Sequence, residues 1–185
     1  MNKLQEYVFL NCSRELEEVK RSHIVNVKSQ LSLEECTLIY KYSEDGYEHL
    51  NERLRISKGK DFSEFGILLD QTLAKLPNYE DITYRAIDLT DNEMLRYIDA
   101  RRNNTTLVEY SFISASRSKT VAYQFGKTCQ FRIFSRSGKN IQEFTKYGNH
   151  HPQNEQEVLF RPNLNFKVLE VIKQSEKTIV TLYEI

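Results

Sequence analysis

A change of hydrophobic pattern near residue 80 is the feature that most constrains the fold. From about residue 11 to 80, apolar residues recur at helical spacing, as in residues 46–55, where Tyr47, Leu50 and Leu54 share one face. Beyond residue 80 the chain consists of short segments rich in β-branched and aromatic residues, separated by turn residues. These segments predict strands at 82–88, 107–114, 129–135, 157–160, 166–172 and 178–185, with helices at 92–102 and 118–126 between them. Helices followed by strands indicate an α+β fold and not a doubly wound α/β fold.

Two local signals predict where helices of the first half begin and end. Ser32 with Glu35 three residues later forms a capping box, which predicts the start of a helix. The helical pattern of residues 61–79 stops at Pro77, because proline cannot continue a helix. A chain of 185 residues suits one domain. We therefore expect a single domain spanning 1–185, in which 1–80 is mainly helical and 81–185 is β-rich.

The overall charge and the cysteines exclude several classes of protein. Charged residues make up 28% of the chain and the formal net charge is zero, so no overall field attracts nucleic acid or a membrane surface. No apolar window is long enough for a transmembrane helix, and the first residues lack the apolar run of a signal peptide. Cys12, Cys36 and Cys129 are scattered, which predicts free thiols and not a disulfide framework. We expect a soluble chain without a nucleic-acid partner or a membrane span.

Phosphate-loop and metal motifs do not account for the polar residues. The segment Gly126-Lys127-Thr128 resembles the end of a phosphate-binding loop, but Val121 stands where the leading glycine is required. His150 and His151 are adjacent and therefore point in different directions, and a third ligand at suitable spacing is missing. We expect no metal site.

Three polar features remain as candidates for a functional site. Arg85 lies in the middle of the first expected strand, where it is either an exposed strand arginine or a planar cation for a diphosphate. Ser114 and Ser116 end the next strand, where Ser116 either caps the following helix or joins Ser114 in orienting another polar group. Glu155 and Glu157 precede an apolar strand, and alternate strand residues project to one face, so the pair is either a solvated strand end or one site. A glycoside hydrolase also requires two carboxylates a few ångströms apart.

The order of these features resembles the R-S-E class of mono-ADP-ribosyltransferases, which includes bacterial binary-toxin enzyme components and vertebrate arginine-specific ecto-transferases. The matching segments are "YRAID" for the arginine motif, "FISAS" for the Ser-Thr-Ser motif, and "NEQEVLFRPNLNFKVLEV" for the E-x-E strand. The helical segment "SLEECTLIYKYSEDGYEHLNERLR" is similar to the toxin-type N-terminal part, so the resemblance covers roughly residues 31 to 185. Ala115 departs from the family's middle threonine, and residues 146–154 are longer and more polar than in many members.

The resemblance implies a mixed, mainly antiparallel split β-sandwich with the helical part packed on it. It implies that NAD is consumed as a substrate, with Arg85 on its diphosphate, Ser114 positioning Glu157, and Ser116 supporting the pocket wall. Glu157 is expected to bind the ribose 2′-hydroxyl and stabilise an oxocarbenium-like state, while Glu155 orients and helps deprotonate an incoming arginine. Tyr147 is the candidate aromatic of the substrate-recognition turn, and an aromatic within 123–131 is the candidate to stack on nicotinamide.

The implied partner is a protein that bears a target arginine, and the implied setting is a toxin or effector that acts in a target-cell cytosol after export without a signal peptide. Two alternatives share the same pocket. One is an NAD glycohydrolase with water as the acceptor, and the other is a non-catalytic NAD-binding module.

Overall fold

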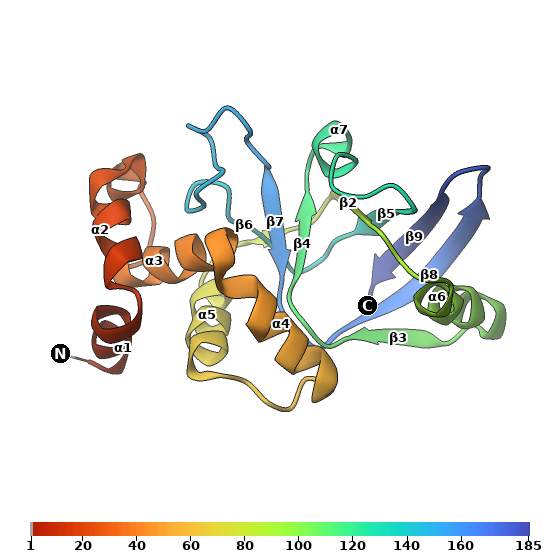
Figure 1. Cartoon of the computed structure of the whole chain (residues 1–185), viewed down its shortest axis with the longest axis horizontal. Helices are drawn as coiled ribbons and strands as arrows, with labels where there is room; N and C mark the ends of the chain where they lie inside the picture. The colour runs from red at the N-terminus through yellow and green to blue at the C-terminus, as the bar shows by residue number, and fades with distance from the viewer. Residues whose placement is uncertain (1) are drawn as a thin grey trace.

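The first half of the chain is helical, as the apolar spacing predicts. The computed structural model describes residues 2–185. Figure 1 shows the helices of this half gathered beside one end of a sheet. They are α1 (Lys3–Asn11), α2 (Ser13–Arg21), α3 (Leu33–Lys41), α4 (Tyr47–Ile56) and α5 (Glu64–Ala74), with a 3-10 turn at His23–Asn26.

The predicted helix signals lie where the helices begin and end. Ser32 caps α3, and the reciprocal hydrogen bonds with Glu35 complete the capping box. Helix α5 ends at Ala74, before Pro77. Between α3 and α4 the backbone makes a π-helical turn, Tyr42–Gly46, which the apolar spacing did not predict. Single π turns inside helices often occur at functional sites.

The second half forms a mixed, mainly antiparallel sheet, which confirms the predicted α+β class. The strands are β1 (Asn78–Tyr79), β2 (Ile82–Ile87), β3 (Thr106–Glu109), β4 (Ile113–Ser116), β5 (Cys129–Phe134), β6 (Gly138–Asn140), β7 (Glu157–Phe160), β8 (Leu164–Lys173) and β9 (Thr178–Glu184). Their order in the sheet is β1-β6-β7-β4-β2-β5-β9-β8-β3, and of these neighbours β5 and β9 run parallel while the others are antiparallel. The predicted helix at 92–102 is α6 (Asp91–Asn103), whereas the one at 118–126 shortens to α7 (Lys119–Ala122).

The sheet is nearly divided in two between β4 and β2. Within residues 2–185, these strands share one paired position, Tyr84 opposite Ser116. On one side of this junction lie β1, β6, β7 and β4, beside the helical half, and on the other side lie the remaining five strands. Polar side chains at the ends of both parts can therefore meet where the strands diverge.

The prediction of one strand over 107–114 is wrong, because this segment forms two strands in different parts of the sheet. Strand β3 pairs with β8 at one edge, and β4 pairs with β7 near the middle. Phe112 lies between them, and its ring is buried in the core beneath the helices. The Phe112 N–H donates to Asn51 Oδ1 at 3.0 Å, so α4 and not a neighbouring strand takes this backbone group.

Two hydrophobic clusters meet at β7. Leu159 packs in the cluster of the helical half, whereas Val158 and Phe160 pack in the cluster between the sheet and α6. All four residues of β7 are buried because both of its faces are covered. This explains why "EVLF" lacks an alternation of polar and apolar residues.

The sequence predicted no transmembrane helix and three free cysteines. None of the helices within residues 2–185 is long and apolar enough to cross a membrane. Cys12, Cys36 and Cys129 are free, as predicted, and they are also buried. Burial raises the pKa of each thiol, to about 11 for Cys12. All three therefore behave as small apolar core residues.

Candidate functional site

A cavity of about 1000 Å³ lies where the two parts of the sheet diverge, with the π turn and α4 along one wall. It is lined by all five residues that the sequence singled out, which come from β2, β4 and the segment entering β7: Arg85, Ser114, Ser116, Glu155 and Glu157. The structure thus brings together residues from three segments far apart in the chain.

Arg85 lies on β2 next to the junction between the two parts of the sheet. Its Nη1 donates to the Ser114 carbonyl oxygen at 2.5 Å, which ties the guanidinium to β4. Burial lowers the pKa of Arg85, although the group remains charged because arginine titrates far above neutral pH. The guanidinium is a half-buried cation that lines the cavity, so the interpretation as a simple exposed strand arginine is wrong.

Ser116 does not cap the helix that follows. Ser118 is the N-cap of α7, since its hydroxyl accepts from the Val121 N–H. The Ser116 hydroxyl instead donates to the Glu155 carbonyl oxygen at 2.7 Å and accepts from the Ser118 N–H at 3.0 Å. Ser116 therefore connects the end of β4 to the residue on which the acidic pair begins.

Glu157 is the most deeply buried carboxyl group of the cavity, with 4% of the residue exposed. It starts β7 and lies opposite Ser116 in the register with β4. Burial raises the pKa of Glu157 to about 7, while a hydrogen bond with Ser114 and the charge of Arg85 oppose this change. A carboxyl that titrates near neutral pH inside a cleft is typical of a functional site.

Glu155 also lines this cavity, but a turn before β7 places it there, which the strand pattern did not predict. Strand β7 begins only at Glu157, and Gln156 between the two glutamates is left-handed, with φ of +48°. The two carboxylates therefore share a cavity because of a turn, and the expectation that they share one face of a strand is wrong. Gln156 is held by two hydrogen bonds: its N–H donates to Asn154 Oδ1, and its carbonyl accepts from the Arg117 N–H. Left-handed non-glycine residues of this kind concentrate at functional sites.

The segment 141–156 before β7 forms a folded loop, which we call the acceptor-side loop. The Glu155 N–H donates to the Tyr147 carbonyl oxygen at 3.0 Å, so the two candidate residues of this loop are joined directly. Both line the cavity. Burial raises the pKa of the Glu155 carboxyl above its usual value.

Residues of the helical wall were not recognised as site residues in the sequence. Tyr42, Tyr47, Asn51 and Arg55 all line the cavity. In an α-helix, residues five apart point in different directions, but the π turn brings the Tyr42 and Tyr47 rings to a centroid distance of 6.2 Å. Asn51 Nδ2 donates to the Tyr42 hydroxyl at 3.1 Å. The signal that was available is the run of Tyr42, Tyr47, Asn51 and Arg55 at spacings of five, four and four.

Of the aromatic residues in 123–131, Phe125 is the one that is exposed at the cavity, with 59% of the residue accessible. Phe131 is buried in the sheet core, where its ring packs against Tyr97. Tyr123 packs edge-on against Tyr84. Phe125 is therefore the aromatic of this segment that a planar ligand group can reach.

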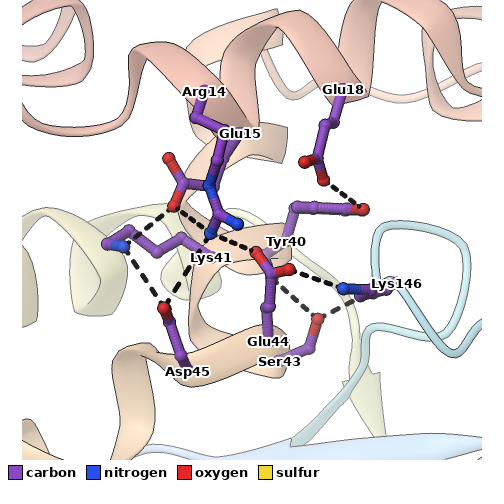
Figure 2. Close-up of polar contacts among 9 residues, drawn as sticks. All are labelled: Arg14, Glu15, Glu18, Tyr40, Lys41, Ser43, Glu44, Asp45 and Lys146. Carbon is purple, nitrogen blue, oxygen red and sulfur yellow. Dashed lines mark hydrogen bonds and ion pairs between the residues drawn. The ribbon is translucent and has the colours of Figure 1, made fainter.

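Among residues 2–185, three carboxylates lie close enough together to hold a metal ion: Glu15, Glu44 and Asp45. Arg14 forms ion pairs with all three, Lys41 pairs with Glu15 and Asp45, and Lys146 pairs with Glu44 (Figure 2). Three cations therefore compensate the charge of the three carboxylates. Within residues 2–185, no histidine belongs to a group of three or more His, Cys, Asp or Glu side chains that could hold a metal ion. The His150 ring packs on His23 at 4.0 Å, and His151 Nδ1 accepts from the Gln153 N–H.

The raised pKa of Glu157 predicts a pH-dependent stability. The folded state binds the proton more tightly than the unfolded chain, so ionisation costs stability as pH rises from about 4.5 to about 7, and the full cost remains above pH 7. We expect Glu157→Gln to raise the free energy of unfolding at pH 8 by up to about 3 kcal/mol, because one pKa unit corresponds to about 1.4 kcal/mol. At pH 4 the substitution should change stability little. Urea denaturation at both pH values measures this, and a gain that is equal at both would contradict the account.

Comparison with known proteins agrees with this geometry. The family model described as ART: NAD:arginine ADP-ribosyltransferase matches residues 2–185. The NAD(+)--protein-arginine ADP-ribosyltransferase Tre1 of Serratia proteamaculans is 31% identical over 150 residues, which are 80% of this chain and 31% of that protein. The putative NAD(+)--arginine ADP-ribosyltransferase Vis of Vibrio splendidus, whose solved structure is described as a toxin, is 25% identical over 170 residues, 82% of this chain and 65% of Vis. The chain thus spans less than two thirds of the length of either curated relative.

A solved structure confirms the fold. Exoenzyme S of Pseudomonas aeruginosa, in a complex with human 14-3-3 protein beta and carba-NAD, superposes with a TM-score of 0.76 at 20% identity, covering 98% of this chain and 86% of that one. At this identity the likeness concerns the fold alone. Because the family model matches almost the whole chain, the chain belongs to the NAD:arginine ADP-ribosyltransferase family.

Proposed function

We propose that this chain, as one domain, is a mono-ADP-ribosyltransferase that cleaves NAD and transfers ADP-ribose to an arginine of a target protein. One observation carries the proposal. A carboxylate buried at the start of β7, Glu157, lies in a single cavity with the guanidinium of Arg85 and the hydroxyls of Ser114 and Ser116. The names of the relatives Tre1 and Vis support the same activity.

Two cations and one aromatic ring of the cavity bind NAD in this proposal. Arg85 binds the diphosphate, because a planar guanidinium matches two phosphate oxygens at once. Arg55 lies on the helical wall of the same cavity and provides a second cation for it. Phe125, which is exposed at the cavity, stacks on a planar ring of the ligand.

Glu157 stabilises the charge that develops during NAD cleavage. The bond between the ribose carbon and nicotinamide breaks, nicotinamide leaves with the bonding electron pair, and the ribose becomes an oxocarbenium-like cation. An ionised carboxylate beside this cation lowers the barrier electrostatically. The pKa of Glu157 is about 7 in the free chain, and the positive nicotinamide ring of bound NAD favours ionisation of a carboxyl near it.

Glu155 acts on the acceptor. It orients the incoming guanidinium, and it takes the proton that the guanidine nitrogen loses when it bonds to the ribose carbon. The Tyr147 carbonyl and the Ser116 hydroxyl fix the backbone of Glu155 on both sides. We also propose that the chain is a toxin or effector that is exported or injected into a target-cell cytosol, as the description of Vis as a toxin suggests.

A pair of small acceptors tests this function. The chain is incubated with NAD and either agmatine or putrescine, which is a matched amine without the guanidine group, and the products are identified by mass spectrometry. We expect an ADP-ribosyl adduct with agmatine only. Nicotinamide release without the adduct would favour an NAD glycohydrolase, and NAD binding without any cleavage would favour a non-catalytic module.

We expect Arg85→Lys to weaken NAD binding by about tenfold or more, because a lysine cannot pair with two phosphate oxygens in one plane. Isothermal titration calorimetry with a non-hydrolysable NAD analogue measures this without turnover. Arg132→Lys, on the neighbouring strand β5, is the matched control for an arginine in a strand. Equal affinities for the Arg85 variant and the unchanged chain would contradict the assignment of Arg85 to the diphosphate.

A further inference from the structure

The acceptor-side loop is connected to the N-terminal helices by a chain of alternating charges (Figure 2). This series of ion pairs runs from α3 and the π turn to α2, and from α2 back through the π turn to the loop. In order, its members are Asp45, Lys41, Glu15, Arg14, Glu44 and Lys146.

Glu44 of the π turn connects α2 to the acceptor-side loop within this series of ion pairs. Its side chain is 12% exposed, and it binds Arg14 Nη2 through Oε2 at 2.8 Å and Lys146 Nζ through Oε1 at 2.5 Å. Each oxygen of one carboxylate therefore binds a cation from a different part of the chain. The hydrogen bond to Glu44 raises the pKa of Lys146, so this ammonium group stays charged at neutral pH.

The backbone of Lys146 is held by the residue next to Glu44. The Lys146 N–H donates to Ser43 Oγ at 3.2 Å, and the Ser43 hydroxyl donates to the Tyr40 carbonyl at 2.8 Å. Two consecutive residues of the π turn thus bind both the main chain and the side chain of Lys146. A main-chain and a side-chain contact together fix the position of a residue better than an exposed ion pair alone.

The path from Lys146 to the acceptor carboxylate is short. Tyr147 is the next residue, and its carbonyl accepts the N–H of Glu155. Tyr147 and Glu155 line the cavity, whereas Lys146 is not among its lining residues in the part of the chain described, 2–185. Lys146 therefore acts on the site through its neighbours.

We propose that Lys146, clamped by Glu44 and Ser43, is a positioning residue that sets how efficiently an arginine competes with water for the ADP-ribosyl group. This inference rests on the proposed function. The groups on the NAD side depend on other contacts: Glu157 and Ser114 are fixed by the pairing of β7 with β4, and Arg85 by its bond to Ser114. Loss of the clamp should therefore displace Glu155 and Tyr147 while leaving NAD cleavage intact.

Loss of the clamp should not unfold the chain. When Lys146 loses its charge, Glu44 keeps its ion pair with Arg14, so no carboxylate is left without a cation. The loop is also anchored elsewhere, where Arg117 donates to Gln142 and the Gln142 side chain donates to Asn149. Partly exposed ion pairs contribute little to stability, so the effect of the clamp is on position.

Kinetics of Lys146→Met, which removes the ion pair with Glu44 but keeps the backbone N–H that donates to Ser43, test the inference. A displacement of about 1 Å at a reacting group can cost about 10²-fold in rate. We expect kcat/KM for agmatine to fall at least about tenfold, while NAD hydrolysis without an acceptor changes less than about twofold. Lys146→Arg keeps the cation and should retain most of the transfer. Lys60→Met, an exposed lysine in the loop between α4 and α5, is the matched control.

A structural readout accompanies the kinetics. In Lys146→Met, amide hydrogen exchange should accelerate in residues 146–156 and not in β4 or β7. An equal fall of transfer and hydrolysis, or unchanged transfer to agmatine, would overturn the positioning role while the proposed function stands. An unchanged chain that forms no agmatine adduct would overturn the proposed function, and this inference with it.

Discussion

Glu157→Gln is expected to slow NAD cleavage by about 10²–10³-fold, which corresponds to roughly 2.7–4 kcal/mol of lost transition-state stabilisation. Glutamine keeps the size of the side chain and its contact with Ser114 but removes the charge that we propose to face the ribose cation. Nicotinamide release at pH 8, where Glu157 of the unchanged chain is largely ionised, measures the effect. NAD should still bind, since Arg85 is retained.

The same variant is expected to be more stable than the unchanged chain at pH 8, as argued above for the buried carboxylate. A loss of activity together with a gain of stability separates a catalytic role from damage to the fold. Glu80→Gln, at an exposed glutamate outside the cavity, is the matched control and should change neither property. Undiminished NAD turnover in Glu157→Gln would refute the mechanism.

The second large effect is expected at Glu155. In Glu155→Gln, transfer to agmatine should fall by about 10²-fold, because a general base at an acceptor contributes a factor of this size or more. NAD hydrolysis should fall only a few-fold, since water is a small acceptor that needs less orientation and Glu157 is unchanged. Separate kinetic measurements of ADP-ribosyl-agmatine and free ADP-ribose give the two rates.

Parallel losses of both products in Glu155→Gln would show that the two carboxylates do not have separable roles. Glu80→Gln is again the control. Glu155→Asp extends the test, because it keeps the charge but withdraws the carboxylate by one methylene group. Its transfer rate should lie between those of the unchanged chain and Glu155→Gln.

The part of the site that lies on strands was predictable from the sequence. Arg85, Ser114, Ser116 and Glu157 lie on β2, β4 and β7, where hydrogen-bonding register fixes which residues face each other. Their order along the chain, together with the resemblance, was sufficient to predict that they lie together, and they line one cavity. The α+β class followed from the change of pattern near residue 80 in the same way.

The remaining features depend on non-regular backbone, which hydrophobic periodicity does not report. The left-handed conformation of Gln156 directs Glu155, and the π turn brings Tyr42 and Tyr47 together. Residues 107–114 look like one strand, but burial of Phe112 under the helices and its bond to Asn51 divide them. At residues 107–114 a tertiary contact thus prevails over the local pattern.

Competition between two acceptors is the most direct test of the central claim that one cavity cleaves NAD and directs the ADP-ribosyl group to a guanidine. With NAD held constant and agmatine increased, nicotinamide, ADP-ribose and ADP-ribosyl-agmatine are quantified in the same reaction. The account predicts that ADP-ribose falls as the adduct rises, and that their sum equals the nicotinamide released. Release of ADP-ribose that does not change with agmatine, with no adduct formed, would contradict it.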